Sequence, residues 1–275
     1  MELHWRVADA DVRSLVWGFV ERRDAVQQGA AFHFPMAYPH LQVTLEGGYR
    51  VDPDLLPSPI PRGALWGSSF RTRLGRPDGK VRAFVAAFTF EGAALLLGGP
   101  PRLAAGHIVD MEALPSPAAA ALVERIVEAS CFELRVRIVE DFFRSLSRAA
   151  APRPSDARIL RLSSAIATDA CAGPVREIAR AAGLSERTLY NRIQAEIGCG
   201  PKHLLRLARL HRLLRTLHPS PLGGRPSIDP LLEFADQAHM HREFVALTGV
   251  KPSAFASSKA KSGDGLFHSV LAGSL

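Results

Sequence analysis

The residues from 174 to 198 include polar side chains whose spacing suits recognition by hydrogen bonding. Arg187, Tyr190, Asn191 and Gln194 occupy positions i, i+3, i+4 and i+7, which share one side of an α-helix. Guanidinium and carboxamide groups form paired hydrogen bonds that match the edges of DNA bases in a major groove. The chemistry implied by this set is base recognition.

The surrounding residues predict two helices joined by a turn. Gly183 permits a left-handed backbone, and Ser185 can cap the helix that follows. Ala179 allows two steeply crossing helices to approach closely. This pattern is typical of a helix-turn-helix, although an ordinary helical hairpin with a solvated polar face shows it too. The apolar positions that would face inward are Val175, Ile178, Ala179, Ala182, Leu189, Ile193 and Ile197.

Two more helices are expected downstream. Pro201 begins a helix that reaches Leu217, with leucines on one side. Its basic residues can lie near phosphates or form a solvated face; they are Lys202, Arg206, Arg209, Arg212 and Arg215. After a loop, a helix falls within residues 234–255, where Phe244 and Leu247 point inward and Gly249 ends the helix.

The positive charge is concentrated in the same half of the chain. The 275 residues carry a formal net charge of +7. Residues 1–154 hold 18 Lys and Arg against 17 Asp and Glu, whereas residues 155–275 hold 16 against 10. This asymmetry suggests a polyanionic partner for the second half, although a merely soluble basic domain also fits.

Residues 155 to about 256 resemble the DNA-binding domain of the AraC family of bacterial transcription regulators. The matching stretches are IARAAGLSERTL, EIGCGPKHLLRLARL and FADQAHMHREFVALTGVKPSAF. The resemblance implies two helix-turn-helix units joined by a long helix, double-stranded DNA as partner, and an RNA polymerase contact if the protein is an activator. Carried over by position, the residues that contact bases are Arg187, Tyr190 and Asn191 in the first unit and Gln237, His241 and Arg242 in the second.

The second unit departs from the family pattern. Pro230 falls inside the expected supporting helix, and Glu233 stands where a turn glycine is usual. Proline in a helix interior costs about 3 kcal/mol, so we expect a short or irregular support. The prediction that follows is a second recognition helix held less firmly than the first.

The first half of the chain predicts mostly strands. Residues 40–46 and 49–51 suggest a hairpin turning at Gly47-Gly48, and residues 64–70 and 81–90 are further strands. Ser116-Pro117 starts a helical pattern that continues to about Leu146. The expected fold is α+β. An antiparallel barrel or sandwich with helices spans residues 1–150, and an all-α double helix-turn-helix domain spans residues 155–260. Each half is long enough to bury its own core.

The first half also resembles a sensor-like domain found ahead of many AraC-type DNA-binding domains. The stretches that carry this likeness are GALWGSSFRTRL and VRAFVAAFTFEGAALLLGGPPRLAAGHIVDMEAL. It implies a role in sensing a small-molecule effector, whose identity stays unknown, or in forming a homodimer. The helices between 116 and 147 can supply a dimer face. The aromatic residues that form either a core, which we favour, or a pocket are Trp17, Phe32, Phe34, Tyr38, Trp66, Phe84, Phe88 and Phe90.

The alternative class is an enzyme or ligand-binding protein with a basic helical appendage. His33, His40 and Glu46 lie near one another in sequence without an HxH pair, so we expect no metal site and no cofactor. Cys131 lies in an apolar helical pattern that favours a buried thiol. The three cysteines form no CxxC pair, which suits a reducing cytoplasm. We also expect no signal peptide, no membrane span and no catalytic activity.

Overall fold

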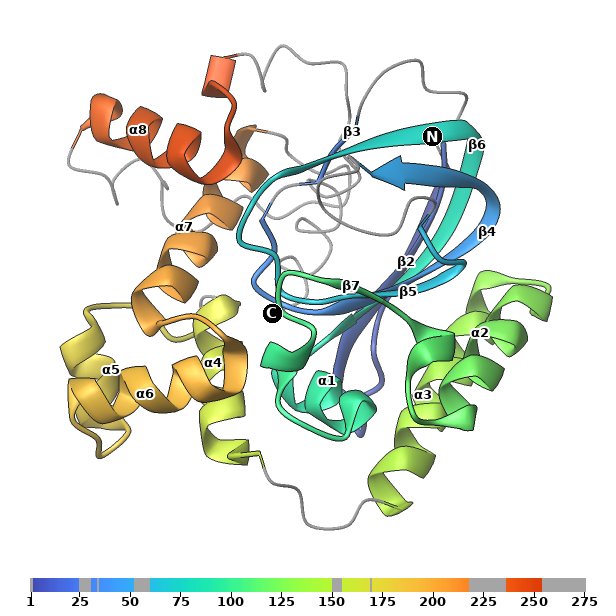
Figure 1. Ribbon diagram of the computed structural model, residues 1–275, viewed down its shortest axis with the longest axis horizontal. Helices are drawn as coiled ribbons and strands as arrows, with labels where there is room; N and C mark the ends of the chain where they lie inside the picture. The colour runs from blue at the N-terminus through green and yellow to red at the C-terminus, as the bar shows by residue number, and fades with distance from the viewer. Residues whose placement is uncertain are drawn as a thin grey trace.

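A computed structural model describes residues 2–24, 31–33, 35–51, 60–149, 155–168, 170–217 and 236–253 (Figure 1). A curved antiparallel sheet and its helices form the first half of the chain, and helices alone form the second. The strands are β1 (Glu2–Val7), β2 (Val16–Asp24), β3 (Ala31–His33), β4 (His40–Val51), β5 (Gly63–Trp66), β6 (Arg73–Phe88) and β7 (Ile108–Asp110).

The described strands form one sheet in the order β1-β2-β6-β4-β5-β7, and β3 pairs with the beginning of β6. Every pairing is antiparallel. The long strand β6 holds the sheet together because β2, β3 and β4 all pair with it. The expected antiparallel β architecture is therefore confirmed, as a single curved sheet.

The predicted hairpin at Gly47-Gly48 is wrong. Residues 40–51 form the single strand β4, which stays paired with β6 on both sides of the two glycines. The pairing register shifts between Thr44 and Gly48, and Gly47 has a φ of 73°. A left-handed glycine in a paired strand forms a bulge that bends the strand, so the same residue type marks a bend here instead of a turn.

The helices of the first half also differ from the sequence prediction. Thr89 caps a helix over residues that were expected to end a strand, accepting a hydrogen bond from the Gly92 N–H. The helical pattern from Pro117 is interrupted at residues 129–131 and forms two helices. The helices of this half are α1 (Phe90–Leu97), α2 (Pro117–Glu128) and α3 (Phe132–Ala149), with short 3₁₀ turns η2 (Pro101–Leu103) and η3 (Met111–Ala113).

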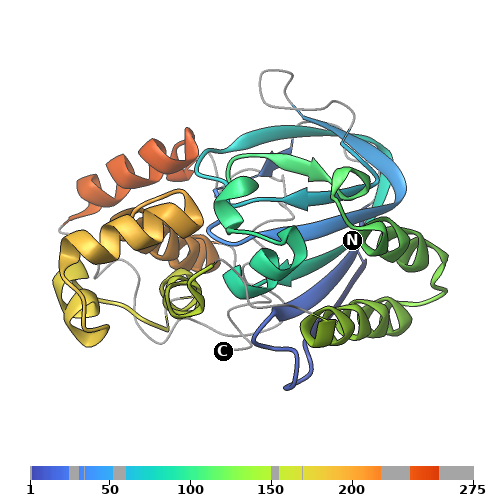
Figure 2. The same cartoon turned by 60° about the horizontal axis from the view of Figure 1, so that its bottom comes forward.

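The helices of the second half follow the predicted order. Asp156 caps the first of them, and Pro201 begins the longest, which reaches Leu217 as predicted. Figure 2 shows this helical group beside the sheet, on the side away from α2 and α3. These helices are α4 (Ala157–Ala167), α5 (Val175–Ala181), α6 (Glu186–Ile197), α7 (Pro201–Leu217) and α8 (Gln237–Thr248).

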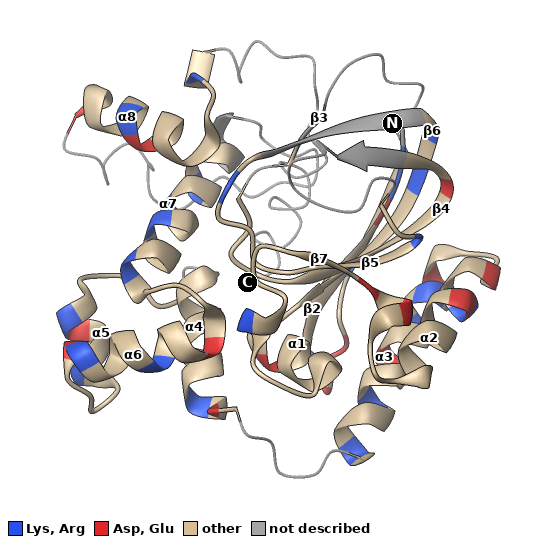
Figure 3. Cartoon of the chain, viewed as in Figure 1, with Lys and Arg blue, Asp and Glu red and all other residues tan. Residues whose placement is uncertain are grey.

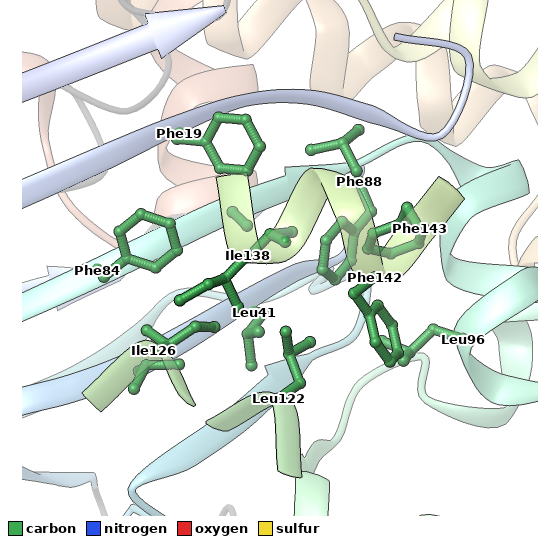
Figure 4. Close-up of a cluster of buried hydrophobic side chains, with 14 of the residues drawn as sticks. Phe19, Leu41, Phe84, Phe88, Leu96, Leu122, Ile126, Ile138, Phe142 and Phe143 are labelled. Atoms are coloured by element: carbon green, nitrogen blue, oxygen red, sulfur yellow. The ribbon is translucent and has the colours of Figure 1, made fainter. Parts of the chain in front are cut away.

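One hydrophobic cluster joins the sheet to α2 and α3 (Figure 4). Phe19, Phe84 and Phe88 on the sheet are fully buried, as are Ile126 on α2 and Phe143 on α3. Burial of one such side chain contributes about 1.5–3 kcal/mol. The apolar stripe of α3, which the sequence left open as a dimer face, is thus covered by the chain's own sheet.

A second cluster contains buried residues of both halves of the chain. Tyr38 and Phe90 of the first half belong to it together with Ile166, Ile193 and Leu214 of the second. Each half is long enough to bury its own core, and in the structure the two halves also share this cluster. The division at about residue 150 stays a prediction about the chain's organisation.

Polar contacts cross between the halves at the same place. The Phe90 N–H donates to Ser164 Oγ at 3.0 Å, and the His211 ring donates to the Pro35 carbonyl at 2.9 Å. His203 packs edge-on against Phe70, with ring centroids 5.0 Å apart. The helical group consequently contacts the first half of the chain through α4 and α7.

Two sequence predictions about single side chains have different outcomes. Cys131 is exposed, contrary to the expected buried thiol, because it lies in the break between α2 and α3. The preference for an aromatic core is confirmed at the buried residues Tyr38, Trp66, Phe84, Phe88 and Phe90. Phe34, the loop from residue 218, Pro230 and Glu233 lie outside the described residues.

Candidate nucleic-acid interface

Local sequence explains why α5 and α6 form a helix-turn-helix. Gly183 takes the left-handed conformation at the turn, with a φ of 70°, as predicted. Ser185 caps α6 by accepting a hydrogen bond from the Thr188 N–H at 3.1 Å, which satisfies one of the amides left free at a helix start. Ala179 is buried, and its small side chain suits close helix packing.

The inner face of α6 is anchored at several points. Leu189, Ile193 and Ile197 are fully buried, as their spacing predicts. Glu196 accepts a hydrogen bond from the Asp156 N–H at 3.0 Å, and Arg192 pairs with the Asp156 carboxylate at 3.3 Å. Together these contacts fix α6 to the beginning of α4.

The opposite face of α6 presents the predicted polar set to solvent. Arg187, Tyr190, Asn191 and Gln194 are all exposed. The Tyr190 ring lies against Gly200, where an added Cβ would come within 2.5 Å of Tyr190 Cε2. The absence of a side chain at Gly200 thus leaves room for the tyrosine ring, a dependence that the sequence did not reveal.

The first half of the chain contacts the end of α6. Gly198 ends the helix in the left-handed conformation, with a φ of 89°. A Cβ at this position would lie 3.3 Å from Ala105 Cβ and 3.4 Å from Arg102 Cβ. Ala105 and Arg102 belong to the first half of the chain. The position of α6 therefore depends on the first half as well as on α4.

The helix α8 carries the second predicted set. Asp236 caps it through the His239 N–H at 2.6 Å, and Gly249 ends it with a φ of 73°. Phe244 and Leu247 are buried, as predicted. The exposed residues include all three that were carried over from the family, Gln237, His241 and Arg242.

The helix α7 joins the two units and carries a row of cations (Figure 3). Arg206 pairs with Glu243 of α8 at 3.0 Å. Arg212 is buried, so the basic residues of α7 do not form a simple solvated face. Burial lowers the pKa of His203, and the nearby Arg206 charge lowers it further.

The residues weighed as metal ligands have other contacts. The His33 and His40 rings stack on Trp66 with centroid distances of 5.2 and 5.7 Å, and Glu46 pairs with Arg23 at 3.6 Å. Within the part of the chain that the structure describes, no three His, Cys, Asp or Glu side chains gather as metal ligands. Burial raises the pKa of the Cys199 thiol to about 12, which keeps it protonated at neutral pH.

Comparison with known proteins supports the assignment of the second half. A helix-turn-helix domain family matches residues 178–258, which include α6, α7 and α8. No curated protein matches the sequence. Among the described residues, no helix has the length and apolarity needed to cross a bilayer.

Several solved structures resemble the chain at low identity. One is ToxT from Vibrio cholerae, with 13% identity, 86% of this chain and 97% of that chain covered, and a TM-score of 0.49. Another is ToxT from strain SCE256 bound to an unsaturated fatty acid, with 11% identity, 86% and 94% coverage, and a TM-score of 0.47. The AraC-like transcriptional activator CuxR has 16% identity, 78% and 86% coverage, and a TM-score of 0.33.

The capped turn between α5 and α6 and the family match define a DNA-binding protein of the helix-turn-helix class. The helix-turn-helix domain matched over residues 178–258 is of the AraC type and supports the predicted DNA-binding transcription regulator. The AraC-type DNA-binding domain implied by the three sequence stretches is therefore supported by this match.

Proposed function

We propose that this regulator binds promoter DNA through two recognition helices, α6 and α8, which enter successive segments of the major groove. One observation carries the proposal: both helices are capped, bury one face and present polar side chains on the other. The helix α7 joins the two units. Its 17 residues span about 25 Å, a length comparable to one turn of DNA at roughly 34 Å.

The exposed residues have the chemistry for direct base recognition. In the first unit these are Arg187, Tyr190 and Asn191, where arginine suits guanine and asparagine suits adenine. In the second unit they are Gln237, His241 and Arg242. Each paired hydrogen bond discriminates against a wrong base by about 1–3 kcal/mol. We propose these six residues as the base-contacting set.

A small-molecule effector is a further proposed partner. Gln42 and Arg22 are buried polar residues of β4 and β2. Strand alternation puts them on the sheet face opposite Leu41 and Phe19, which pack with α2 and α3. Polar groups held in a mostly apolar site are typical of small-molecule recognition. Mass spectrometry of the native protein tests the proposal, since a bound effector adds a defined mass that Gln42→Leu should lose.

The resemblance to the family supports the remaining partners. We propose that the chain forms a homodimer and, if it activates transcription, contacts RNA polymerase. We further propose that it works in the cytoplasm, where bacterial DNA is found, and that it has no catalytic activity. Sedimentation of the purified chain tests the dimer, which should double the mass at micromolar concentration.

Selection of DNA from a random-sequence library tests the main proposal. The full-length chain should enrich one sequence whose two conserved blocks lie about one helical turn apart. Fluorescence anisotropy should then show tighter binding to this duplex than to a scrambled duplex of the same composition. Enrichment of no sequence, with equal affinity for both duplexes, would contradict sequence-specific binding.

A further inference from the structure

An open groove of about 870 Å³ lies along α7 in the DNA-binding half. The start of α5 forms one wall, the first residue of α6 contributes to it, and α7 forms the other wall. The groove lies between two segments that are separated in sequence. Its composition gives it a chemical preference.

The groove is lined by many more cations than anions. Among the described residues that line it, five are basic, namely Arg176, Lys202, Arg206, Arg209 and Arg212, whereas one, Glu186, is acidic. Arg206 also pairs with Glu243, and Arg176 lies 4.0 Å from the Glu177 carboxylate, so part of the charge is balanced. The exposed Lys202 adds a further positive charge to this lining, which favours an anionic occupant.

Apolar side chains line the same groove between the charges. Pro174, Val175 and Leu205 are among its lining residues. A site for a free inorganic anion needs polar donors and gains little from such contacts. The sugar–phosphate backbone of DNA, by contrast, alternates anionic phosphates with less polar deoxyribose rings. The mixed lining therefore suits a stretch of nucleic-acid backbone.

The groove is also connected to both recognition helices. Glu186 is the first residue of α6, and Arg206 is tied to α8 through its 3.0 Å pair with Glu243. Two recognition helices in successive major-groove segments leave one minor-groove segment between them, and the helix that joins them spans the same interval. In this chain that helix is α7.

We propose that the groove along α7 binds the sugar–phosphate backbone of the DNA segment between the two major-groove segments. This proposal rests on the proposed function and adds a third contact that fixes the spacing between the two recognition helices. Lys202 and Arg176 hold phosphates there without contacting bases. Glu186 opposes the binding because its carboxylate repels the backbone.

The test measures how salt affects DNA binding by the full-length chain. The probes are the duplex recovered by library selection and a scrambled duplex. The double variant Arg176→Gln/Lys202→Gln changes two exposed side chains. The matched control is Arg137→Gln, an exposed arginine of α3 in the first half. Each lost phosphate contact lowers the slope of log affinity against log salt by about 0.9.

We expect the double variant to lower this slope by about 1.8 and to weaken both duplexes equally, on the order of tenfold. Glu186→Gln should tighten both duplexes, and Arg137→Gln should change neither. Neutral methylphosphonate linkages in the central segment of the selected duplex should weaken wild type more than the double variant. A double variant with unchanged slope on both duplexes overturns the groove proposal.

Other outcomes separate this proposal from the proposed function. If wild type prefers the selected duplex and the slope is unchanged in the double variant, the groove proposal alone fails. If wild type binds neither duplex, the proposed function fails as well. If free pyrophosphate binds wild type but not the double variant, and the DNA slope is unchanged, the groove is a small-anion site and the backbone proposal is wrong.

Discussion

The two DNA-binding units of this chain differ in how firmly the described residues hold them. Helix α6 has three fully buried side chains, two polar links to the start of α4, and a contact between Gly198 and residues 102 and 105. Helix α8 is capped and buries Phe244 and Leu247, and Arg206 links it to α7. The segment expected to support α8 lies outside the described residues.

This difference predicts how base recognition and phosphate binding are divided between the two units. A side chain reads a base only when it is held within about 0.5 Å of the right position, whereas attraction to a phosphate tolerates more movement. The firmly held α6 should therefore supply more sequence discrimination than α8.

The largest effect on stability should come from a cavity created in the hydrophobic core beneath α6. Ile193 is fully buried in the cluster shared by both halves, so Ile193→Ala should lower the free energy of unfolding of the full chain by about 2–5 kcal/mol. Leu247→Ala is the matched change beneath α8, where the leucine is 7% exposed, and should cost less. Urea denaturation measures both losses. An equal or larger loss for Leu247→Ala would mean that the second unit is packed as tightly as the first.

Sequence patterns predicted the DNA-binding units well because their signals are local. Gly183, Ser185 and Pro201 determine the turn, the cap and the start of α7 through the conformation of their own backbone, and each behaves as expected. The buried positions Leu189 and Ile197 follow from helical spacing.

Features that depend on tertiary packing were missed. Gly47 looked like a hairpin turn because nothing local indicates that β6 pairs with both sides of it. The groove lined by Arg176 and Lys202 lies between α5 and α7, and spacing along the chain cannot indicate that these two helices face one groove. The contact of His211 with Pro35 likewise joins residues far apart in sequence.

A smaller effect should come from disturbing Tyr190 on the exposed face of α6. The methyl group of Gly200→Ala would come within 2.5 Å of the tyrosine ring, so the ring must move. We expect this variant to lose about 1 kcal/mol of binding to the selected duplex. The control is Gly48→Ala, whose added carbon meets nothing within 4 Å.

Anisotropy measurements on the double variant Gly200→Ala/Tyr190→Ala test whether the glycine affects DNA binding through the tyrosine ring. It should bind no more weakly than Tyr190→Ala alone, because the glycine acts through the ring. Additive losses in the double variant would show that Gly200 matters for a reason other than Tyr190.

The smallest effect concerns pH at the contact between the halves. Burial and the Arg206 charge lower the pKa of His203, which packs against Phe70. The unfolded chain then binds a proton more readily than the folded chain. Stability from this histidine is therefore present above about pH 6.5 and is lost as the pH falls below that value.

Urea denaturation at about pH 7.5 and about pH 5.5, either side of the ordinary histidine pKa, measures this loss. Wild type should lose more stability on acidification than His203→Gln, which cannot titrate. Burial raises the pKa of Glu140, so protonation of this carboxyl on acidification stabilises the folded chain. This contribution is the same in wild type and in His203→Gln, and it cancels when the two proteins are compared. An identical pH dependence of the two proteins would rule out the role of His203.

Helix α6 should discriminate between DNA sequences more strongly than α8. The direct measurement is the affinity of Arg187→Ala, Asn191→Ala, Gln237→Ala and Arg242→Ala for the selected and scrambled duplexes at one salt concentration. The two α6 variants should lose about 1–3 kcal/mol on the selected duplex and little on the scrambled one. The two α8 variants should lose less discrimination, with Arg242→Ala weakening both duplexes alike. Equal loss of discrimination in all four variants would show that α8 is held as firmly as α6 and would contradict the account.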